Sequence, residues 1–408
     1  MVRTDLDRSR ILFSWLIILW LVMPMSYAGA APSVYPTGVT IYNRDKAYGA
    51  YTLFRMGASN KVVLIDMEGN VVNSWKSPTW STFRNIGHAK PLPNKLLLVQ
   101  LYDQLENKKL VEMDWSGHIV WKYYSSSFPF LHHDFQRLDS GNTLIVGSEY
   151  PFKVYANVAK RKIRNDVIKE IDRTGAVVWQ WSTAAHYGQL PLTDGERNVI
   201  YSGNNPDIFH TNSIQEIPDN RYAASNPAFR KGNLLVSQRN TSTVFIIDKA
   251  TGDIVWSTRG QTLGEHDVKM IPGWLPGAGN ILFFDNGWGG GVVKQYRNYS
   301  RVIEMNPVDQ TLAWTYDAHL SQKSLLSFFS PYRSGEQRLP NGNTLICESA
   351  WGRIFEVAPD GEIVWEYINP EVVKNPQRDY ANWLYRAYRV DYSWVGGGQP
   401  DPAGPFIW

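Results

Sequence analysis

Several polar residues of this 408-residue chain fall at matching places in a recurring strand pattern. Three stand five positions before an aliphatic residue that precedes a turn: His133 before Leu138, Asn212 before Ile217 and His266 before Ile271. His210 lies two residues before Asn212, so an extended strand places both on one face. Arg239, seven residues after Gly232, ends the second strand of its hairpin and returns to the same rim. We expect these side chains to converge on a central channel.

Three imidazoles, an amide and a guanidinium around one opening suit the binding of a tetrahedral anion. Arginine offers a planar fork of donors, and imidazole adds a donor or a nucleophile. We therefore predict catalytic roles for His133, His210, His266 and Arg239, and substrate binding for Asn212. A transition-metal site built from the three histidines is an alternative, which the positive charge of Arg239 disfavours. Neither a metal ion nor a cofactor is predicted.

Further substrate-binding residues are expected at the same rim. The loops that follow the returning strands carry Tyr150, Trp288 and Trp351, whose rings could stack on an aromatic substrate. Asn286 ends the second strand of its hairpin, at the position equivalent to that of Arg239. In a regular strand the side chain of His132 faces into the blade and that of His133 faces the channel, whereas a bulge would exchange the two directions.

Other residues of these types are interpreted as structural. Asp134 and Asp267 directly follow His133 and His266, so a regular strand points them to the opposite face, in structural or orienting roles. His88 is out of register by one residue, and Cys347 lies in the apolar strand TLICES, typical of a packed thiol. Surface positions are expected for the three histidines in outer turns and loops: His118, His186 and His319.

The elements that position these residues recur along the chain. Inner hairpins are predicted at PLPNKLLLV, RLDSGNTLIVG, FRKGNLLVSQ, PGAGNILFFD and RLPNGNTLICE. Each of these five is followed by an outer hairpin with a tryptophan at a fixed place: Trp121, Trp179, Trp256, Trp314 and Trp365. A looser sixth copy, EGNVVNSW, ends at Trp75. Repeats of 46 to 77 residues that consist of strands indicate an all-β, six-bladed β-propeller, with the tryptophans packed between blades.

Composition supports one large folded domain. The chain is 43% hydrophobic, and its net charge of +3, without a run of lysines or arginines, gives no footprint for nucleic acid. Residues 1–30 combine arginines, an apolar stretch and small residues, which predicts a signal peptide or an N-terminal membrane anchor. The propeller is assigned to residues 31–395 and a Gly/Pro-rich tail to residues 396–408. The body of the protein is therefore expected in the periplasm or another extracytoplasmic compartment.

The quoted segments also resemble a known family. PTGVTIYNRDKAYGAYTLF, LIDMEGNVVNSW, HHDF, FHTNS, LLVSQRNTSTVFIIDKATGDIVW, GEHDVKMIP, LFFDNGWGG and NWLYRAYRV are similar to the bacterial arylsulfotransferases, over nearly the whole chain after the leader. That resemblance implies an exported six-bladed propeller that moves a sulfuryl group from a phenolic sulfate ester to a phenol without a nucleotide donor. It implies that His266 is transiently sulfated in a ping-pong cycle. The residues that it implies for sulfate binding are His210, Asn212, Arg239 and a histidine of HHD.

Two other function classes stay open at this point. DKATGDIVWSTRG resembles the tryptophan-docking repeats of quinoprotein propellers, but those generally have eight blades and a calcium site of clustered oxygen ligands. A non-catalytic propeller of the cell envelope, which binds a ligand or serves as a scaffold, is the second alternative. The donor, the acceptor and the oligomeric state do not follow from the sequence.

Overall fold

The computed structural model describes residues 36–57, 60–77, 85–103, 108–128, 130–375 and 379–396. The chain divides into two compact units, residues 1–36 and 37–408, and the described strands belong to the second. The predicted leader and all of the predicted tail except Gly396 lie outside the described residues. Within the described ranges, no helix is long and apolar enough to cross a membrane.

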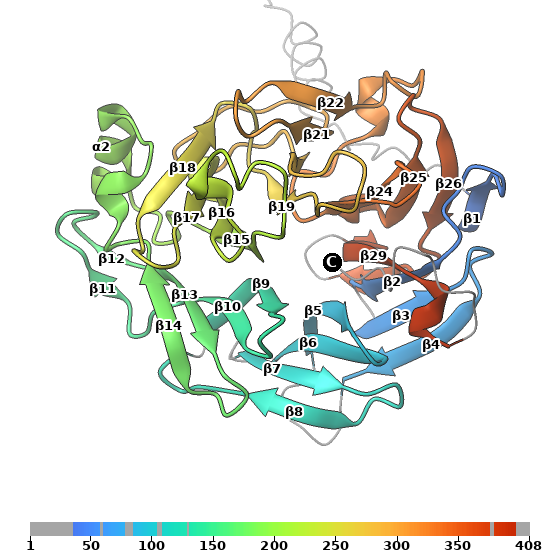
Figure 1. Cartoon of the computed structure of the whole chain (residues 1–408), viewed down its shortest axis with the longest axis horizontal. Coiled ribbons are helices and arrows are strands. Elements are labelled where there is room, and N and C mark those ends of the chain that lie inside the picture. The colour runs from blue at the N-terminus through green and yellow to red at the C-terminus, as the bar shows by residue number, and fades with distance from the viewer. Residues whose placement is uncertain are drawn as a thin grey trace, which may run out of the picture. The chain divides into compact units, whose positions relative to one another are not determined.

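The second unit is a ring of six antiparallel sheets, which confirms the predicted six-bladed β-propeller (Figure 1). From the innermost strand outward, the blades are β29–β2–β3–β4, β5–β6–β7–β8, β9–β10–β13–β14, β15–β16–β17–β18, β19–β20–β21–β22 and β23–β24–β25–β26, numbered here as blades 1 to 6. Six blades, not eight, argue against the quinoprotein alternative. The end of the ring at which the innermost strands begin is called the histidine rim below.

The four strands of each blade are four to eight residues long. The innermost strands are β29 (Leu384–Val390), β5 (Asn85–Leu92), β9 (Phe130–Arg137), β15 (Thr211–Glu216), β19 (His266–Met270) and β23 (Gly335–Arg338). The second strands are β2 (Tyr51–Met56), β6 (Leu96–Tyr102), β10 (Thr143–Ser148), β16 (Leu234–Gln238), β20 (Ile281–Asp285) and β24 (Thr344–Glu348). The third strands are β3 (Lys61–Ile65), β7 (Lys108–Met113), β13 (Asp166–Ile171), β17 (Thr243–Ile247), β21 (Arg301–Met305) and β25 (Arg353–Val357). The outer strands are β4 (Val71–Lys76), β8 (Ile119–Tyr123), β14 (Val177–Ser182), β18 (Ile254–Arg259), β22 (Leu312–Tyr316) and β26 (Ile363–Ile368).

Both ends of the described chain help to close the ring. The late strand β29 pairs with β2 and supplies the innermost strand of blade 1. At the other end, β1 (Gly38–Tyr42) pairs with β26 and adds a fifth strand to the outside of blade 6. Because the last blade is joined to β1 and the first blade to β29, closure depends on residues far apart in the sequence.

The repeated tryptophans connect neighbouring blades, as predicted. Each indole Nε1 donates to a carbonyl in the outer turn of the next blade: Trp75 to Asp114, Trp121 to Arg173, Trp179 to Lys249, Trp256 to Pro307, Trp314 to Pro359 and Trp365 to Met67. The bond from Trp365 to Met67 joins the sixth blade to the first. Aliphatic and aromatic residues fill the spaces between blades, for example Val244 and Ile246 of blade 4 against Val268 and Met270 of blade 5.

The long interval between Trp179 and Trp256 contains an insertion. It forms α2 (Asp194–Ser202), a helix on the outside of the ring (Figure 1). Thr193 and Glu196 form a reciprocal capping box at its start, which satisfies two backbone N–H groups. Short strands and turns complete the described structure: β11 (Lys153–Val154), β12 (Lys162–Ile163), β27 (Val373–Asn375), β28 (Asp379–Ala381), η1 (Tyr187–Gln189), η2 (Pro227–Phe229), η3 (Arg239–Thr241), η4 (Leu325–Ser327), η5 (Ser349–Trp351) and η6 (Tyr392–Trp394).

Bulges interrupt the innermost strands close to the histidine rim. In β9 the pairing shifts between Leu131 and Phe135, so the two histidines between them lie in a bulge. Pairing also shifts between His266 and Lys269 in β19. A bulge turns side chains away from strict alternation. The bulges in β9 and β19 therefore determine which side chains face the channel.

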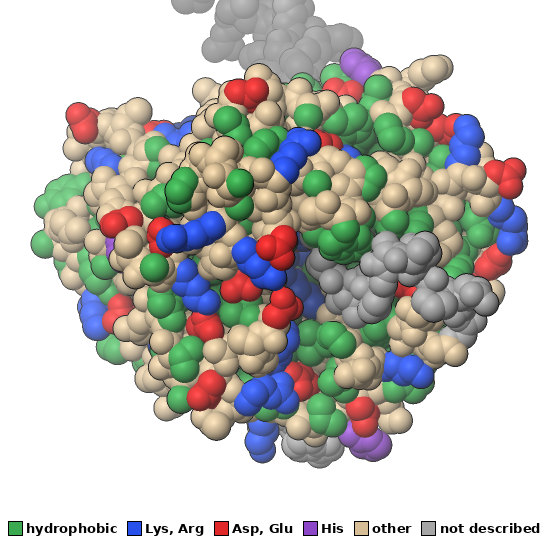
Figure 2. All heavy atoms as spheres, viewed as in Figure 1, with side chains coloured by type: hydrophobic (Ala, Val, Ile, Leu, Met, Phe, Trp, Pro, Cys, Tyr) green, Lys and Arg blue, Asp and Glu red, His purple; other side chains and the backbone are tan. Residues whose placement is uncertain are grey.

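Surface charge is mixed. On the face that Figure 2 shows, lysine and arginine side chains lie interspersed with aspartate and glutamate side chains. That face carries no large patch of a single charge.

Candidate active site

His266 begins β19 and is almost completely buried. Its Nδ1 lies 2.7 Å from Oδ1 of Asn286. The side-chain amide of Asn286 must direct Oδ1 toward His266, because its Nδ2 donates to the carbonyls of Ser330 at 2.7 Å and Arg333 at 3.0 Å. Nδ1 of His266 must therefore carry the proton, and Nε2 holds the lone pair.

The surroundings of His266 keep its imidazole neutral. Burial lowers its pKa well below the ordinary value, and the nearby Arg239 lowers it further. Nε2 accepts a hydrogen bond of 3.3 Å from the backbone N–H of Arg333, which is at the long end of the range. The ring thus presents a neutral, fixed nitrogen base that is only weakly engaged.

Arg239 follows β16 and starts the turn η3. Its Nη1 donates to Oδ1 of Asn240 at 2.9 Å, and Nδ2 of Asn240 donates to the carbonyl of Asp207 at 2.6 Å. The guanidinium also packs closely on the backbone of Gly290, where a Cβ would lie 2.6 Å from Nη1. These contacts hold Arg239 beside His266, with its charge available to an anion.

His210 forms a dyad with a carboxylate that sequence reasoning missed. Its Nδ1 lies 2.6 Å from Oδ2 of Asp207, which leaves Nε2 for a substrate. The ring centroid of His210 is 4.5 Å from that of His133, so these two predicted residues are brought together. Both have a left-handed backbone with φ of 57°, which is uncommon outside glycine and is concentrated at functional sites.

His133 and its neighbour both lie near the site. Nδ1 of His133 is 3.3 Å from the hydroxyl of Tyr385, and burial lowers the pKa of His133, with a further contribution from His210. His132 instead contacts Asp166, with Nε2 to Oδ1 at 3.3 Å. His133 thus takes the channel position beside His210, as the simple register predicts, although the strand is bulged.

Asn212 holds the backbone of the next blade. Its Nδ2 donates to the carbonyl of Glu265 at 2.6 Å, and the residue is completely buried. The other amide atom, Oδ1, has no hydrogen-bond partner within the described residues. Asn212 therefore positions the segment that leads into His266, in addition to any contact with a substrate.

The predicted aromatic residues sit on the surrounding loops. Tyr150 is 50% exposed, Trp288 47% and Trp351 61%. Their described contacts are local: Tyr150 packs on Phe130, with ring centroids 5.4 Å apart, and Trp288 packs on Tyr296 at 5.8 Å. The structure leaves their faces accessible and does not place them against the imidazoles.

The two aspartates that follow histidines are structural, as predicted, but the predicted direction of their side chains is wrong. Asp134 and Asp267 both form ion pairs with Arg386 of β29, at 3.2 and 2.9 Å. Since the three residues come from blades 3, 5 and 1, these contacts span the channel. Lys90 and Lys269 complete the network, at 2.7 Å from Asp134 and Asp267 respectively. The bulges in β9 and β19 cause the difference from a regular strand.

His88 and Cys347 are buried, as expected. Nε2 of His88 is 2.7 Å from the hydroxyl of Tyr388, and its Nδ1 is 3.1 Å from the carbonyl of His133. Cys347 is 1% exposed in the core between blades, and burial raises the pKa of its thiol. Neither residue is available as a nucleophile.

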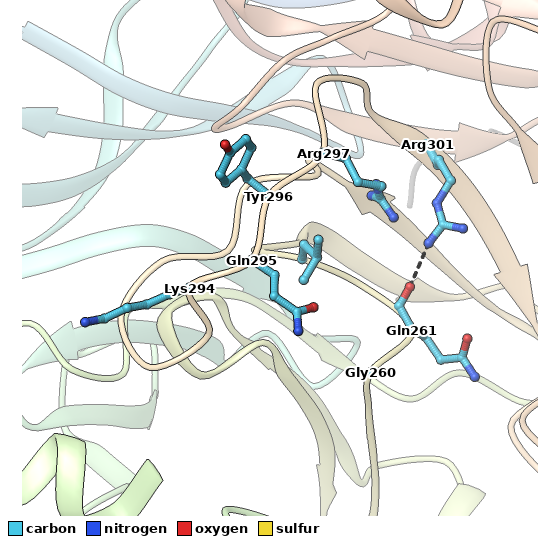
Figure 3. A pocket seen from close by; sticks show the side chains of 8 residues that line it. Gly260, Gln261, Lys294, Gln295, Tyr296, Arg297 and Arg301 are labelled. Atoms are coloured by element: carbon cyan, nitrogen blue, oxygen red, sulfur yellow. Dashed lines mark hydrogen bonds between the residues drawn. The ribbon is translucent and has the colours of Figure 1, made fainter. Parts of the chain in front are cut away.

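A separate pocket of about 470 Å³ lies beside the loop that leads to His266. Figure 3 shows the side chains of Arg297 and Arg301 pointing toward Gln261, whose carbonyl accepts a hydrogen bond from Arg301 at 2.8 Å. Both arginines pair with the buried carboxylate of Asp285, at 2.5 and 2.7 Å. Their charge is therefore partly neutralised within the protein.

A buried glutamate that precedes His266 was also missed as a candidate. Ser237 and Thr262 donate to its two oxygens at 2.9 and 2.7 Å, and burial raises the pKa of Glu265 to about 7. No group of three or more metal-binding side chains occurs in the described ranges. The arrangement is therefore a propeller with a fixed neutral imidazole, an adjacent guanidinium and a histidine–aspartate dyad, which suits the binding of an anionic group.

Comparison with known proteins identifies the family. A sequence model described as arylsulfotransferase (ASST) matches residues 88–370, a stretch that contains every predicted site residue, and the chain belongs to this family. Membership implies arylsulfotransferase activity in general, with an aryl sulfate as donor and a phenol as acceptor. A search of curated proteins found no match.

Comparison with solved structures gives matches at low sequence identity. A protein of unknown function from Bacteroides caccae is 14% identical, with a TM-score of 0.52 over 83% of this chain and 98% of that one. A streptogramin B lyase is 10% identical, with a TM-score of 0.44 over 87% of this chain and 92% of that one. A virginiamycin B lyase from Staphylococcus aureus is 9% identical, with a TM-score of 0.43 over 82% and 88%. The first likeness is one of fold alone, and the other two are weaker.

Proposed function

We propose that this chain is an exported arylsulfotransferase that works by a ping-pong cycle through a sulfated His266. The observation that carries this proposal is the hydrogen bond from Nδ1 of His266 to Asn286, which leaves Nε2 as a neutral nucleophile. A neutral imidazole attacks sulfur far better than an imidazolium, and burial holds His266 in that form.

In the first half of the cycle, Nε2 of His266 attacks the sulfur of the aryl sulfate. The N–S bond forms as the S–O bond to the aryl oxygen breaks, and the phenolate leaves. His210, whose Nδ1 is held by Asp207, donates a proton from Nε2 to that oxygen. A phenol is released, and His266 carries the sulfuryl group.

In the second half, an acceptor phenol takes the place of the first. Its hydroxyl proton passes to Nε2 of His210, its oxygen attacks sulfur, and the N–S bond to His266 breaks. The enzyme returns to its starting protonation state. No nucleotide takes part in this cycle.

In this proposal, Arg239 and His133 bind the sulfuryl oxygens of the substrate. A guanidinium next to the nucleophile stabilises the charge of the transition state, and a contact of this kind contributes about 2–4 kcal/mol. Asn212 and Asn286 hold the nucleophile, and His132 supports His133. Tyr150, Trp288 and Trp351 offer aromatic faces to the incoming or departing phenol.

Export rests on the sequence of residues 1–30, which has the arrangement of a signal peptide or a membrane anchor. We propose that the propeller works in the periplasm or another extracytoplasmic compartment. Mass spectrometry of protein purified from the cell envelope distinguishes a cleaved leader from a retained one.

The test of the mechanism is intact-mass spectrometry after mixing with 4-nitrophenyl sulfate and no acceptor. We expect one added sulfuryl group, located by peptide mapping at His266. His266→Ala should lose both the adduct and nitrophenol release, whereas the control His118→Ala, at an outer turn with a side chain that is 79% exposed, should keep both. Unchanged turnover in His266→Ala would exclude the sulfohistidine. The absence of adduct and of phenol release across several donors would favour a non-catalytic binding protein.

A further inference from the structure

Arg55 is a buried arginine without a carboxylate partner among the described residues. It lies near the end of β2 and is 3% exposed. Three other arginines with side chains less than a tenth exposed each pair with a carboxylate: Arg338 with Glu304, Arg386 with Asp134 and Asp267, and Arg389 with Glu356. Nε of Arg55 has no hydrogen-bond partner in the described structure. Its charge is thus buried with the Tyr102 hydroxyl and an aromatic ring nearby but without an ion-pair partner in the described structure, an arrangement that an incoming anion would stabilise.

A second guanidinium, that of Arg333, shares the same aromatic ring. The central carbon of the Arg333 guanidinium lies 3.8 Å from the ring centroid of Trp383, and that of Arg55 lies 4.6 Å from it. Like Arg55, Arg333 forms no ion pair in the described part of the chain. Burial lowers the pKa of Arg55 to about 10, with a contribution from Arg333, so Arg55 remains charged near neutral pH.

The protein builds this arrangement at some cost to its backbone. Arg333 and Ser334 are consecutive non-glycine residues with left-handed backbones, at φ of 60° and 80°. Trp383 lies directly against Gly57, whose N–H donates to the carbonyl of Trp383 at 2.8 Å. A Cβ on Gly57 would come within 2.1 Å of the indole. Strained backbone and a required close approach are typical of a positioned site.

These charges border the nucleophile. The backbone N–H of Arg333 donates a hydrogen bond to Nε2 of His266, and the guanidinium of the same residue lies over Trp383. Tyr385, two residues after Trp383, contacts His133 through its hydroxyl. Arg239 approaches His266 from blade 4, whereas Arg55 belongs to blade 1. Arg239 and Arg55 therefore come from different blades, and Arg333 connects the guanidinium pair to His266 through its backbone N–H.

We propose that Arg55 and Arg333 form a second anion-binding subsite, which receives an acidic group on the aromatic ring of the substrate while the sulfuryl group lies at Arg239. The preferred phenols are thus those with a carboxylate, phosphate or second sulfate on the ring or on a short substituent. Two guanidiniums in a desolvated setting bind such a group by charge-assisted hydrogen bonds, and Trp383 and Tyr385 flank the ring. The assignment of substrates rests on the proposed sulfuryl transfer.

The kinetic test compares two acceptors of similar size, the anionic 4-hydroxyphenylacetate and the neutral 4-hydroxyphenylethanol. With one donor, kcat/KM for the anionic acceptor should exceed that for the neutral one about tenfold or more, which corresponds to about 1.4 kcal/mol. Arg55→Met and Arg333→Gln should each bring this ratio close to one. Arg44→Gln, which removes an arginine with a 68% exposed side chain from the outside of the ring, should leave the ratio as it is. A wild-type preference for the neutral acceptor, or an unchanged ratio in both variants, would overturn the subsite.

A binding measurement separates this proposal from the proposed activity. If no acceptor is sulfated, the activity is disproved, and the subsite is tested by the melting temperature with each phenol alone. 4-Hydroxyphenylacetate should raise the melting temperature of the wild type and of Arg44→Gln more than the neutral phenol does, but not that of Arg333→Gln. The partly exposed Arg333 provides this test even if replacing the buried Arg55 prevents folding. Equal shifts with both phenols in the wild type would disprove the subsite.

Discussion

Nδ1 of His266 and Oδ1 of Asn286 are 2.7 Å apart, and the two carbonyls that hold the other end of the Asn286 amide make this contact directional. Asn286 makes the shortest of the contacts that keep the proton on Nδ1 of the proposed nucleophile, together with the carbonyl of Gly264 at 3.2 Å from Nδ1 and the N–H of Arg333 at 3.3 Å from Nε2. The imidazole could otherwise adopt the other tautomer, with its lone pair directed away from the reacting position.

Asn286→Ala should therefore slow sulfuryl transfer about a hundredfold or more, although no group that touches sulfur is removed. The ¹⁵N chemical shifts of His266 should also show a mixture of tautomers in the variant and the Nδ1–H form in the wild type. Asn280→Ala is a matched control, because Asn280 is a buried amide at the other end of the same strand, β20. A rate loss of the same size in both variants would indicate a general effect on folding.

His210→Ala tests the proton transfer. If His210 protonates the departing oxygen, its loss should lower kcat/KM with phenyl sulfate by about 10²–10⁴-fold. 4-Nitrophenyl sulfate should be affected much less, because the far more acidic nitrophenol leaves without protonation. Asp207→Asn should show the same difference between donors in a weaker form, since Asp207 orients His210. An equal loss with both donors would instead assign His210 to sulfuryl binding.

Much of this site follows from the sequence because strand ends are regular. The turn residues locate the ends of the inner strands, so His133, His210 and His266 could be brought to one rim by counting. The repeated tryptophans determine the number of blades in the same way. Local patterns of this kind carry over directly into the structure.

The missed residues depend on contacts that counting does not reach. Arg333 lies in a loop with left-handed backbone, where no strand pattern applies. Tyr385 and Trp383 enter the site only because the late strand β29 closes blade 1, more than 300 residues after β2 in the sequence. Extending the count to NWLYRAYRV as a sixth inner strand could have found Tyr385 and Arg386. The inward turn of Asp134 and Asp267 required knowledge of the bulges.

Glu265→Gln should change the pH dependence of stability. Burial raises the pKa of Glu265 from 4.5 to about 7, so the folded state binds this proton more tightly than the unfolded state does. The resulting stabilisation is present below pH 4.5 and is lost as the pH rises through 7. A difference of about 2.5 pKa units corresponds to roughly 3 kcal/mol.

Because glutamine carries no charge, the free energy of unfolding of Glu265→Gln should be higher than that of the wild type at pH 8. At pH 4.5 the two values should be nearly the same. Denaturant titrations at both pH values measure this difference. Glu68→Gln, at a carboxylate with a 44% exposed side chain, serves as the control and should show no such trend. A constant offset between Glu265→Gln and the wild type at all pH values would mean that Glu265 stays ionised in the folded protein.

Trp365→Phe tests how the ring is closed. Trp365 is completely buried, and its Nε1 donates at 2.8 Å to the carbonyl of Met67, which joins blade 6 to blade 1. Phenylalanine keeps most of the apolar contact but leaves that carbonyl without its donor, at a cost of about 1–3 kcal/mol. Trp314→Phe removes the equivalent bond, 3.0 Å to Pro359, at a more exposed place and should cost less. Denaturant unfolding of both variants measures the two losses. Equal losses would show that these two blade contacts contribute alike. A larger loss at Trp365 would show that the stability of the ring depends more on the junction of the last and first blades.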